Sequence, residues 1–169
     1  DKGFDLSILR PSVIFGADDK FLNLFAKLQK VFPLMPLAGA DARFQPVWVQ
    51  DVANAVVACL KGAGGLASPR IIEAAGPDVY TLKELVQLSA QLSGVAGGAG
   101  RPVLALPTWA GRLQAKMMGM APGEPLMSVD NLDSMKVDNV ASGKFPGLVA
   151  LGISAAALKP IAQQYLMRK

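Results

Sequence analysis

Hydrophobic residues follow two patterns along the chain, short continuous runs and helical spacing. Runs rich in β-branched or aromatic residues predict strands near residues 6–10, 46–49, 70–75 and 102–106. Apolar positions three or four residues apart predict helices near residues 20–32, 52–60, 81–93, 107–120 and 128–140, and another after Ser154. Strands and helices alternate in the first half and helices prevail in the second, which predicts an α/β fold.

Local signals mark several helix boundaries. Asp18 or Asp19 is the predicted cap of the first helix and Asp51 that of the second, because carboxylates accept hydrogen bonds from the free N–H groups of a first turn. Residues 81–84 have the Thr-x-x-Glu spacing of a capping box. Pro160 is expected to interrupt the last helix, since proline has no backbone N–H.

Composition narrows the classes of protein that the chain can represent. Of its 169 residues, 51% are hydrophobic and 18% charged, with a net charge of +4, one cysteine and no histidine. The lack of histidine excludes a Ser-His-Asp triad and histidine-bearing zinc sites, and a single thiol excludes an internal disulfide. No run of about 20 apolar residues is present, so we expect no transmembrane span. A chain this apolar is expected to cover part of its surface with a partner.

The start of the chain leads to a related expectation. It begins Asp1-Lys2-Gly3, with no methionine and no apolar signal run. We therefore expect a fragment of a longer polypeptide, whose missing N-terminal half is a partner of this chain. If the strand near residues 6–10 pairs inside a larger parallel sheet, both of its faces should be buried, which accounts for its apolar sequence.

Two stretches carry a resemblance to a known family: SILRPSVIFGADD at residues 7–19 and FQPVWVQDVANAVV at residues 44–57. In this order and spacing they resemble the extended and atypical short-chain dehydrogenase/reductase proteins of the NAD-dependent epimerase/dehydratase superfamily. Within it they are most similar to bacterial relatives of the NAD(P)H-binding accessory subunit of respiratory complex I. GPDVYTLKELV at residues 76–86 matches the strand, turn and helix that follow in that superfamily. The resemblance covers residues 6–93 and is weak beyond them.

The resemblance implies a division of the chain into two parts. Residues 1–93 would form the C-terminal portion of a Rossmann-like parallel sheet, with insertions of the substrate lobe. Residues 94–169 would form a smaller, mainly helical lobe on the substrate side. NAD or NADP would bind to the full-length protein but not tightly to this chain, because the glycine-rich phosphate turn belongs upstream. The glycines at 94–100 follow a helix and are interpreted as a linker.

The resemblance also implies contacts with the cofactor. The loop after the Leu-Arg-Pro strand faces the nicotinamide in this superfamily. Backbone groups around Pro11, Ser12 and Val13 would bind the carboxamide, with Pro11 fixing the φ angle of the loop. The alternative is a simple strand end packed in the core.

Substrate contacts are implied at three further positions. Arg43, Gln45 and Trp48 stand where superfamily members line the substrate pocket. Arg43 suits a phosphate or carboxylate because it offers a bidentate pair of donors, although a solvated surface arginine is the alternative. Many relatives have histidine at the position of Trp48.

Catalytic residues are expected outside this chain. The Tyr-x-x-x-Lys pair of the superfamily lies upstream of the Leu-Arg-Pro strand, hence before Asp1. Tyr165 and Lys169 have the same spacing, but they lie at the end of the chain, where no nicotinamide loop can follow. We expect no catalytic residue and no metal site here, and we expect Cys59, in an apolar helical run, to be buried and inert.

Two functions remain open. The leading one is a substrate-side fragment of an NAD(P)-binding oxidoreductase or epimerase, inactive by itself. The alternative is a non-catalytic NAD(P)H-binding or assembly subunit of a respiratory complex. In that case the basic helix near Trp109 and Met120 would contact a protein or an acidic membrane surface, although a core helix with a solvated basic face is the plainer interpretation. The chain has no run of basic residues, so we expect no binding to nucleic acid. We expect a cytoplasmic location, and in the second case a position peripheral to the inner membrane.

Overall fold

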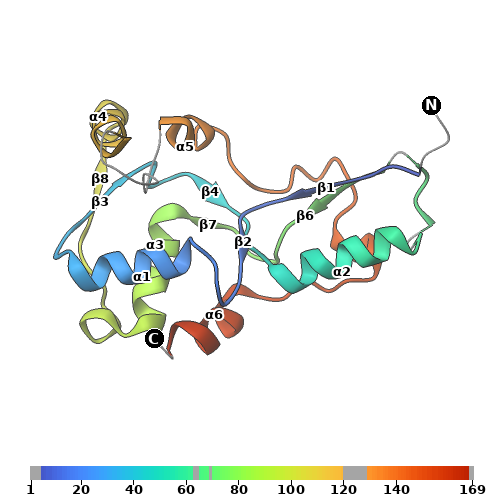
Figure 1. Cartoon of the computed structure of the whole chain (residues 1–169), viewed down its shortest axis with the longest axis horizontal. Helices are drawn as coiled ribbons and strands as arrows, with labels where there is room; N and C mark the ends of the chain where they lie inside the picture. Colours follow the sequence, from blue (N-terminus) through green and yellow to red (C-terminus); the bar gives the residue numbers. More distant parts are fainter. Residues whose placement is uncertain (1–4, 63–64, 69, 120–128, 168–169) are drawn as a thin grey trace. The chain divides into compact units, whose positions relative to one another are not determined.

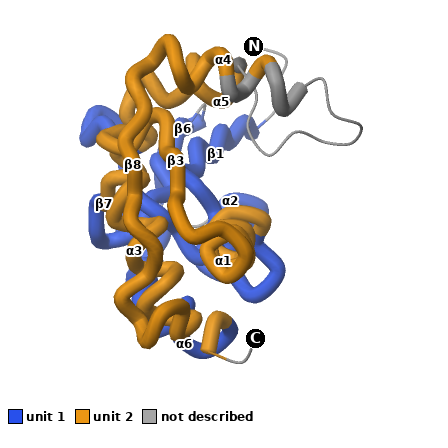
Figure 2. Tube along the Cα trace, turned by 90° about the vertical axis from the view of Figure 1, so that its left-hand side faces the viewer, with its two compact units in different colours: residues 1–19, 45–79, 140–165 blue, residues 20–44, 80–139, 166–169 orange. Residues whose placement is uncertain are grey.

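The computed structural model describes residues 5–62, 65–68, 70–119 and 129–167 (Figure 1). The chain divides into two compact units (Figure 2). Unit 1 comprises Asp1–Asp19, Gln45–Val79 and Val140–Tyr165, and unit 2 comprises Lys20–Phe44, Tyr80–Asn139 and Leu166–Lys169. Each unit is assembled from three separate stretches of chain. The division after residue 93 stays a prediction, and Met120, Ser128 and Lys169 lie outside the described residues.

Unit 1 contains two parallel strand pairs. β1 (Ser7–Pro11) pairs with β6 (Arg70–Ala74), and β2 (Ile14–Phe15) pairs with β5 (Val47–Trp48). Its helical elements are α2 (Val49–Leu60), the 3-10 turn η3 (Leu148–Leu151) and α6 (Leu158–Leu166), of which α6 belongs to this unit up to Tyr165. Parallel pairs need long crossover connections, so this arrangement confirms the predicted α/β class.

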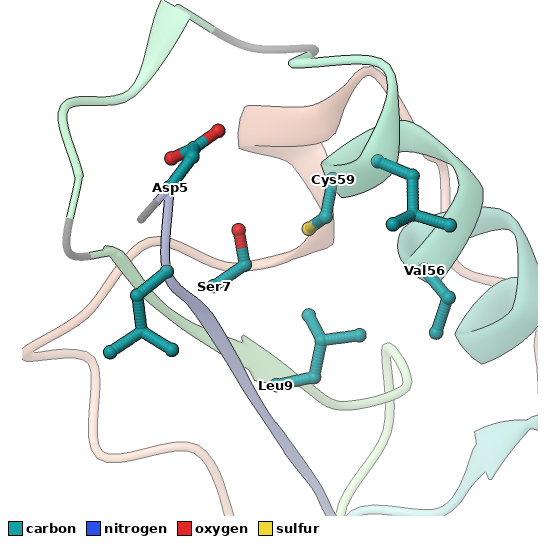
Figure 3. A pocket seen from close by; sticks show the side chains of 7 residues that line it. Asp5, Ser7, Leu9, Val56 and Cys59 are labelled. Carbon is teal, nitrogen blue, oxygen red and sulfur yellow. The ribbon is translucent and has the colours of Figure 1, made fainter. Parts of the chain in front are cut away.

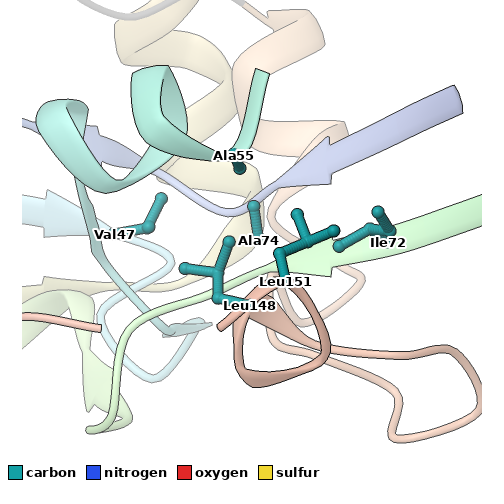
Figure 4. Packing of buried hydrophobic residues seen from close by; sticks show 6 residues of the cluster. All are labelled: Val47, Ala55, Ile72, Ala74, Leu148 and Leu151. Carbon is teal, nitrogen blue, oxygen red and sulfur yellow. The ribbon is translucent and has the colours of Figure 1, made fainter. Parts of the chain in front are cut away.

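The core of unit 1 forms where α2 and η3 meet β5 and β6 (Figure 4). Its buried side chains are Val47, Ala55, Ile72, Ala74, Leu148 and Leu151. Ala55 and Asp51 are the buried residues of α2, whereas Val49, Val56, Val57 and Leu60 are exposed. Helix α2 therefore packs on this core through Ala55 and, less deeply, through Val52, Ala58 and Cys59, while its other apolar side chains stay exposed.

Unit 2 contains one parallel and one antiparallel pair, β3 (Met35–Ala38) with β8 (Val103–Leu106) and β4 (Arg43–Phe44) with β7 (Tyr80–Thr81). Its helices are α1 (Leu22–Val31), α3 (Leu82–Ser93), the 3-10 turn η2 (Val95–Gly98), α4 (Thr108–Gly119) and α5 (Val129–Ser134). Between α1 and α3, the buried Gln29 donates to the Val86 carbonyl (2.8 Å) and accepts from the Arg101 N–H (3.2 Å). A buried amide with partners at both ends fixes how these segments meet.

The predicted capping box at the start of α3 is confirmed. Thr81 Oγ1 accepts from the Glu84 N–H (3.2 Å), and Glu84 Oε2 accepts from the Thr81 N–H (2.7 Å). The predicted aspartate cap of α1 is wrong, because the N-cap position is Phe21, without a capping side chain. Asp19 instead accepts from the Gly16 N–H (3.3 Å), a local loop contact that competes with capping.

Proline positions explain two further differences from the sequence prediction. Pro160 does not interrupt α6, because it is the third residue of the helix, where a backbone N–H has no partner within the helix. The sequence patterns predict no strand at residues 35–38, where the structure has β3 with Pro36 inside it. The helix expected near residues 128–140 is shorter, as α5 ends at Ser134.

Strand β1 has an unpaired edge. Within the described residues it pairs with β6 alone. Ile8 is 42% exposed and Leu6 is 49% exposed. Burial of both faces, which is expected for this strand inside a larger parallel sheet, stays a prediction.

The packing of unit 1 predicts different costs for two isoleucines on neighbouring strands. Ile72→Ala removes fully buried methylene groups and should lower the free energy of unfolding by about 2–4 kcal/mol. Ile8→Ala, on the exposed face of β1, should cost less than about 1 kcal/mol. Urea denaturation followed by circular dichroism measures both values. Equal losses in the two variants would contradict this placement of the core.

Candidate functional site

The loop that follows β1 is held at the carboxyl end of the β1–β6 pair. Pro11 is exposed, Ser12 is 8% exposed and Val13 is half-buried. The Ser12 N–H donates to the Ala74 carbonyl (3.1 Å), and the Val13 carbonyl accepts from the Val47 N–H (3.0 Å). Ligands of open α/β sheets bind outside the carboxyl ends of the strands, so the loop lies where this architecture places a site.

Gln45 connects this loop with two other segments of unit 1. Its main-chain N–H donates to Ser12 Oγ (3.1 Å), and its side-chain Nε2 donates to the Gly76 carbonyl (2.7 Å). Its Oε1 accepts from the Ala141 N–H (2.9 Å). Both ends of the amide thus have partners within the protein, so Gln45 acts first as a structural bridge, and a role in substrate binding stays a prediction.

Gly76 permits the close approach of two loops. Its N–H donates to the Gln45 carbonyl (3.3 Å), and a Cβ at this position would lie 1.9 Å from the Pro46 carbonyl oxygen. No side chain fits so close to a backbone atom. The turn after β6 therefore requires glycine for steric reasons.

Trp48 and Asp51 lie at the start of α2. Trp48 is half-buried and occupies the N-cap position, whereas Asp51 is the third residue of the helix. The prediction that Asp51 is the N-cap is wrong. Its buried carboxylate instead accepts from the Ala156 N–H (2.8 Å) and holds the segment before α6 against α2. This contact joins residues 105 positions apart, which no local pattern can reveal.

Arg43 belongs to unit 2, whereas the other five residues with an implied ligand contact belong to unit 1. It is exposed in β4, opposite Thr81 of β7. Its N–H donates to Asp138 Oδ1 (3.2 Å), and its carbonyl accepts from the Asn139 N–H (2.8 Å). These two hydrogen bonds use the backbone of Arg43 to hold residues 138 and 139 beside β4, and the ligand role of its side chain stays a prediction.

Sequence reasoning missed Glu73, which lies within an apolar strand. Its carboxylate is mostly buried and accepts from the N–H groups of Ser142 and Gly143, at 3.0 Å each, and from Ser142 Oγ at 2.7 Å. The Ser142 hydroxyl and backbone hydrogen bonds lower the pKa of Glu73, and the charge of Arg10 contributes. A single acidic residue in the run RIIEA was the available signal, because a buried carboxylate needs donors.

Tyr165 has the environment of a structural tyrosine. Its hydroxyl donates to Asp19 Oδ2 (2.8 Å), and burial together with the charge of Asp19 raises the pKa of Tyr165. A catalytic tyrosine base needs a lowered pKa, so this environment opposes that role. Lys169, the other half of the apparent motif, lies outside the described residues.

A hollow of about 510 Å³ lies beside β1 (Figure 3). Its lining comes from the start of the chain and from one end of α2: Asp5, Leu6, Ser7, Leu9, Val56, Cys59 and Leu60. Cys59 is half-buried rather than fully buried as expected. The hollow lies between the strand and the apolar surface of α2, and most of its lining residues are apolar.

Comparison with known proteins shows which proteins this chain is similar to in sequence. No family model matches the chain. It is 30% identical over 169 residues to mitochondrial NADH dehydrogenase (ubiquinone) 1 alpha subcomplex subunit 9 of Mus musculus, covering 95% of this chain and 41% of that protein. The chain spans about two fifths or less of the length of the curated relatives it matches.

Solved structures of low sequence identity share the fold. UDP-glucose 4-epimerase of Thermotoga maritima, solved with UDP-glucose, has a TM-score of 0.52 at 12% identity, over 99% of this chain and 48% of that one. The enzyme of Stenotrophomonas maltophila, with bound NAD and formylated UDP-arabinopyranose, has a TM-score of 0.50 at 16% identity, over 98% of this chain and 49% of that one.

The chain has the fold of the UDP-glucose 4-epimerases in solved structures. In sequence it is related to subunit 9 of the NADH dehydrogenase alpha subcomplex over nearly its whole length, which confirms the resemblance found in the sequence. Each helix in the described part of the chain is too short or too polar to cross a membrane.

The contact between Gly76 and Pro46 predicts a large cost for one added methyl group. Gly76→Ala should lower the free energy of unfolding by about 3 kcal/mol or more, because the backbone of residues 45–47 must move. Gly147→Ala is the matched control, since its Cβ would lie 3.8 Å from the nearest atom, and it should cost less than about 1 kcal/mol. Thermal unfolding of both variants tests this close approach. A tolerated Gly76→Ala would show that the two loops do not meet as described.

Proposed function

We propose that the longer protein containing this chain is a non-catalytic NAD(P)H-binding subunit of a respiratory-complex type, peripheral to the membrane. The observation that carries the proposal is the 30% identity to an NADH dehydrogenase subunit over 95% of the chain. The likeness to the epimerases is one of fold alone, at 12% and 16% identity. The oxidoreductase or epimerase interpretation therefore has less support.

The loop at residues 11–13 fits a cofactor contact in part. It lies at the carboxyl end of parallel strands, and Pro11 presents an exposed ring. The N–H of Ser12 and the carbonyl of Val13 are already bonded within the protein. We therefore assign the nicotinamide contact to Pro11 and to the half-buried side chain of Val13, with Ser12 holding the loop in place.

The free edge of β1 and the hollow beside it suit one partner, a further part of the same polypeptide. In the part of the chain that the structure describes, this edge of β1 has no strand partner, and the hollow adds apolar side chains of α2. A strand that adds to such an edge satisfies its backbone groups and buries the adjacent apolar surface. The relatives are more than twice as long as this chain, which is consistent with such a segment.

Helix α4 offers a second surface, for a protein partner. Trp109 and Leu113, one helical turn apart, are 71% and 55% exposed. The guanidinium of Arg112 is bonded to both carboxylate oxygens of Asp133, at 2.9 and 3.1 Å, so part of the basic charge predicted for this helix is neutralised. A large exposed indole with a balanced ion pair beside it favours a protein contact over an acidic membrane surface.

Cofactor binding in the longer protein tests the proposed function. Isothermal titration calorimetry should show NADH binding to the longer protein and none at micromolar NADH for residues 1–169 alone. Pro11→Gly should weaken the affinity about tenfold, because the loop loses its fixed φ angle and must be ordered on binding. The control is Pro33→Gly, an exposed proline of unit 2, which should bind like the parent protein. Micromolar affinity of the short chain, or turnover of NADH by the longer protein, would contradict the proposal.

Stability measurements on the two lengths of chain test the partner of β1. Leu60 is 83% exposed in this chain, so Leu60→Ser should change its stability by less than about 0.5 kcal/mol. In the longer protein the same change should cost about 2 kcal/mol, because the side chain becomes buried. Val149→Ser, at an 81% exposed site on η3, serves as the control and should be neutral in both. A neutral Leu60→Ser in the longer protein would remove this surface as the docking site.

A further inference from the structure

Residues 141–147 form a strap that lies along β6 in unit 1. The Glu73 N–H donates to the Pro146 carbonyl (2.9 Å), and Glu73 stands opposite Gly147 in a parallel bridge. Most residues of the strap are exposed, and Phe145 is half-buried. Its position is therefore set mainly by hydrogen bonds rather than by apolar burial.

Glu73 is the main anchor of the strap. One carboxylate oxygen accepts from the N–H and hydroxyl of Ser142, and the other accepts from the N–H of Gly143. Gly143 has a φ angle of 71°, a left-handed conformation that lets successive N–H groups converge on one anion. Arg10 adds a contact from β1, with its guanidinium carbon 5.7 Å from the centre of the Phe145 ring.

Gln45 extends the anchor to the loop after β1. Its Oε1 accepts from Ala141, the first residue of the strap, while its main-chain N–H donates to Ser12 Oγ. Its Nε2 bonds to the Gly76 carbonyl in the turn after β6. One residue therefore contacts the strap, the turn after β6 and the loop at residues 11–13.

We propose that Glu73 and Gln45 are positioning residues, which hold the strap in place and through Ser12 fix the loop at residues 11–13 for ligand binding. The ligand part rests on the proposed function, because it takes that loop to meet the nicotinamide end of NAD(P)H. The positioning part rests on the hydrogen bonds of unit 1. The experiment below separates the two.

The charge of Glu73 gives the anchor a pH dependence. Arg10 faces it from β1, and the hydroxyl and N–H groups of Ser142 and Gly143 face it from the strap. These groups lower the pKa of Glu73 in the folded protein. A depressed pKa means that the carboxylate stabilises the fold above its unfolded-state pKa, and that this contribution is lost as the pH falls through the folded-state pKa.

Amide hydrogen exchange of the chain tests the positioning part. Glu73→Gln replaces one acceptor oxygen by an amide donor facing the N–H of Gly143, and Gln45→Met removes both side-chain bonds at similar volume. Each variant should raise exchange about tenfold at residues 141–143 and also at Ser12 and Gln45. As the pH falls, exchange at the strap of the unmodified chain should rise above the intrinsic change with pH. The Glu73→Gln variant should show no such additional rise, because it has no carboxylate to protonate at this position.

Two control variants make the same substitutions, Glu to Gln and Gln to Met, at positions away from the strap. Glu84→Gln removes one exposed carboxylate at a capping-box position that glutamine also serves. Gln50→Met removes an exposed amide of α2, whose side chain bonds to Asn54. Neither should change exchange at the strap or at Ser12. Faster exchange confined to residues 141–143, with Ser12 and Gln45 unchanged, would overturn the proposal.

The affinity of the longer protein for NADH tests the ligand part of the proposal. Glu73→Gln and Gln45→Met should weaken binding about tenfold, and the two controls should leave it unchanged. Unchanged affinity in variants with a loosened strap would overturn the ligand part of the proposal. If the parent protein itself binds no NADH, the proposed function fails, and exchange at Ser12 still decides whether Glu73 and Gln45 position the loop.

Discussion

The parallel pairing of β1 with β6 is the constraint on which the rest of unit 1 depends. It brings the loop after β1 beside the turn after β6, although more than 60 residues separate the paired positions. Ser12 then completes the junction, because its N–H bonds to Ala74 and its hydroxyl accepts from Gln45. A buried backbone group without such a partner would destabilise the fold by about 1–3 kcal/mol, so each of these contacts limits where the next segment can lie.

Hydrogen bonds hold many segments of unit 1 in position, because the burial of apolar side chains in this unit is incomplete. Helix α2 turns only the small Ala55 and the carboxylate of Asp51 fully inward, and the edge of β1 has no strand partner within the described residues. The high apolar fraction of the sequence is thus partly displayed on surfaces rather than packed in a core. Such surfaces are typical of proteins that are completed by further chain or by other subunits.

Several residues with an implied ligand contact also make hydrogen bonds that stabilise unit 1. The positions that the family resemblance marks for ligand contact include groups that unit 1 already uses to hold itself together. Gln45 bonds at both ends of its amide, and Ser12 is almost fully buried. For the ligand contact proposed above, hydrogen bonds that hold the loop in place beforehand would reduce the ordering cost of binding. Under the same proposal the loop depends on residues, such as Glu73, that touch no ligand.

The sequence by itself determined the α/β class, the resemblance to the relatives found by comparison and the elements whose signals are local. The capping box at Thr81 and the strands at residues 7–11 and 70–74 depend on residues that are neighbours in the chain. Only the tertiary structure decided the partners of Asp51, Glu73 and Gln45, because their hydrogen bonds span 105, about 70 and up to 96 positions. A carboxylate or amide in a sequence shows that a partner is needed. Which partner it finds is fixed by how distant strands and loops meet, and no periodicity encodes that.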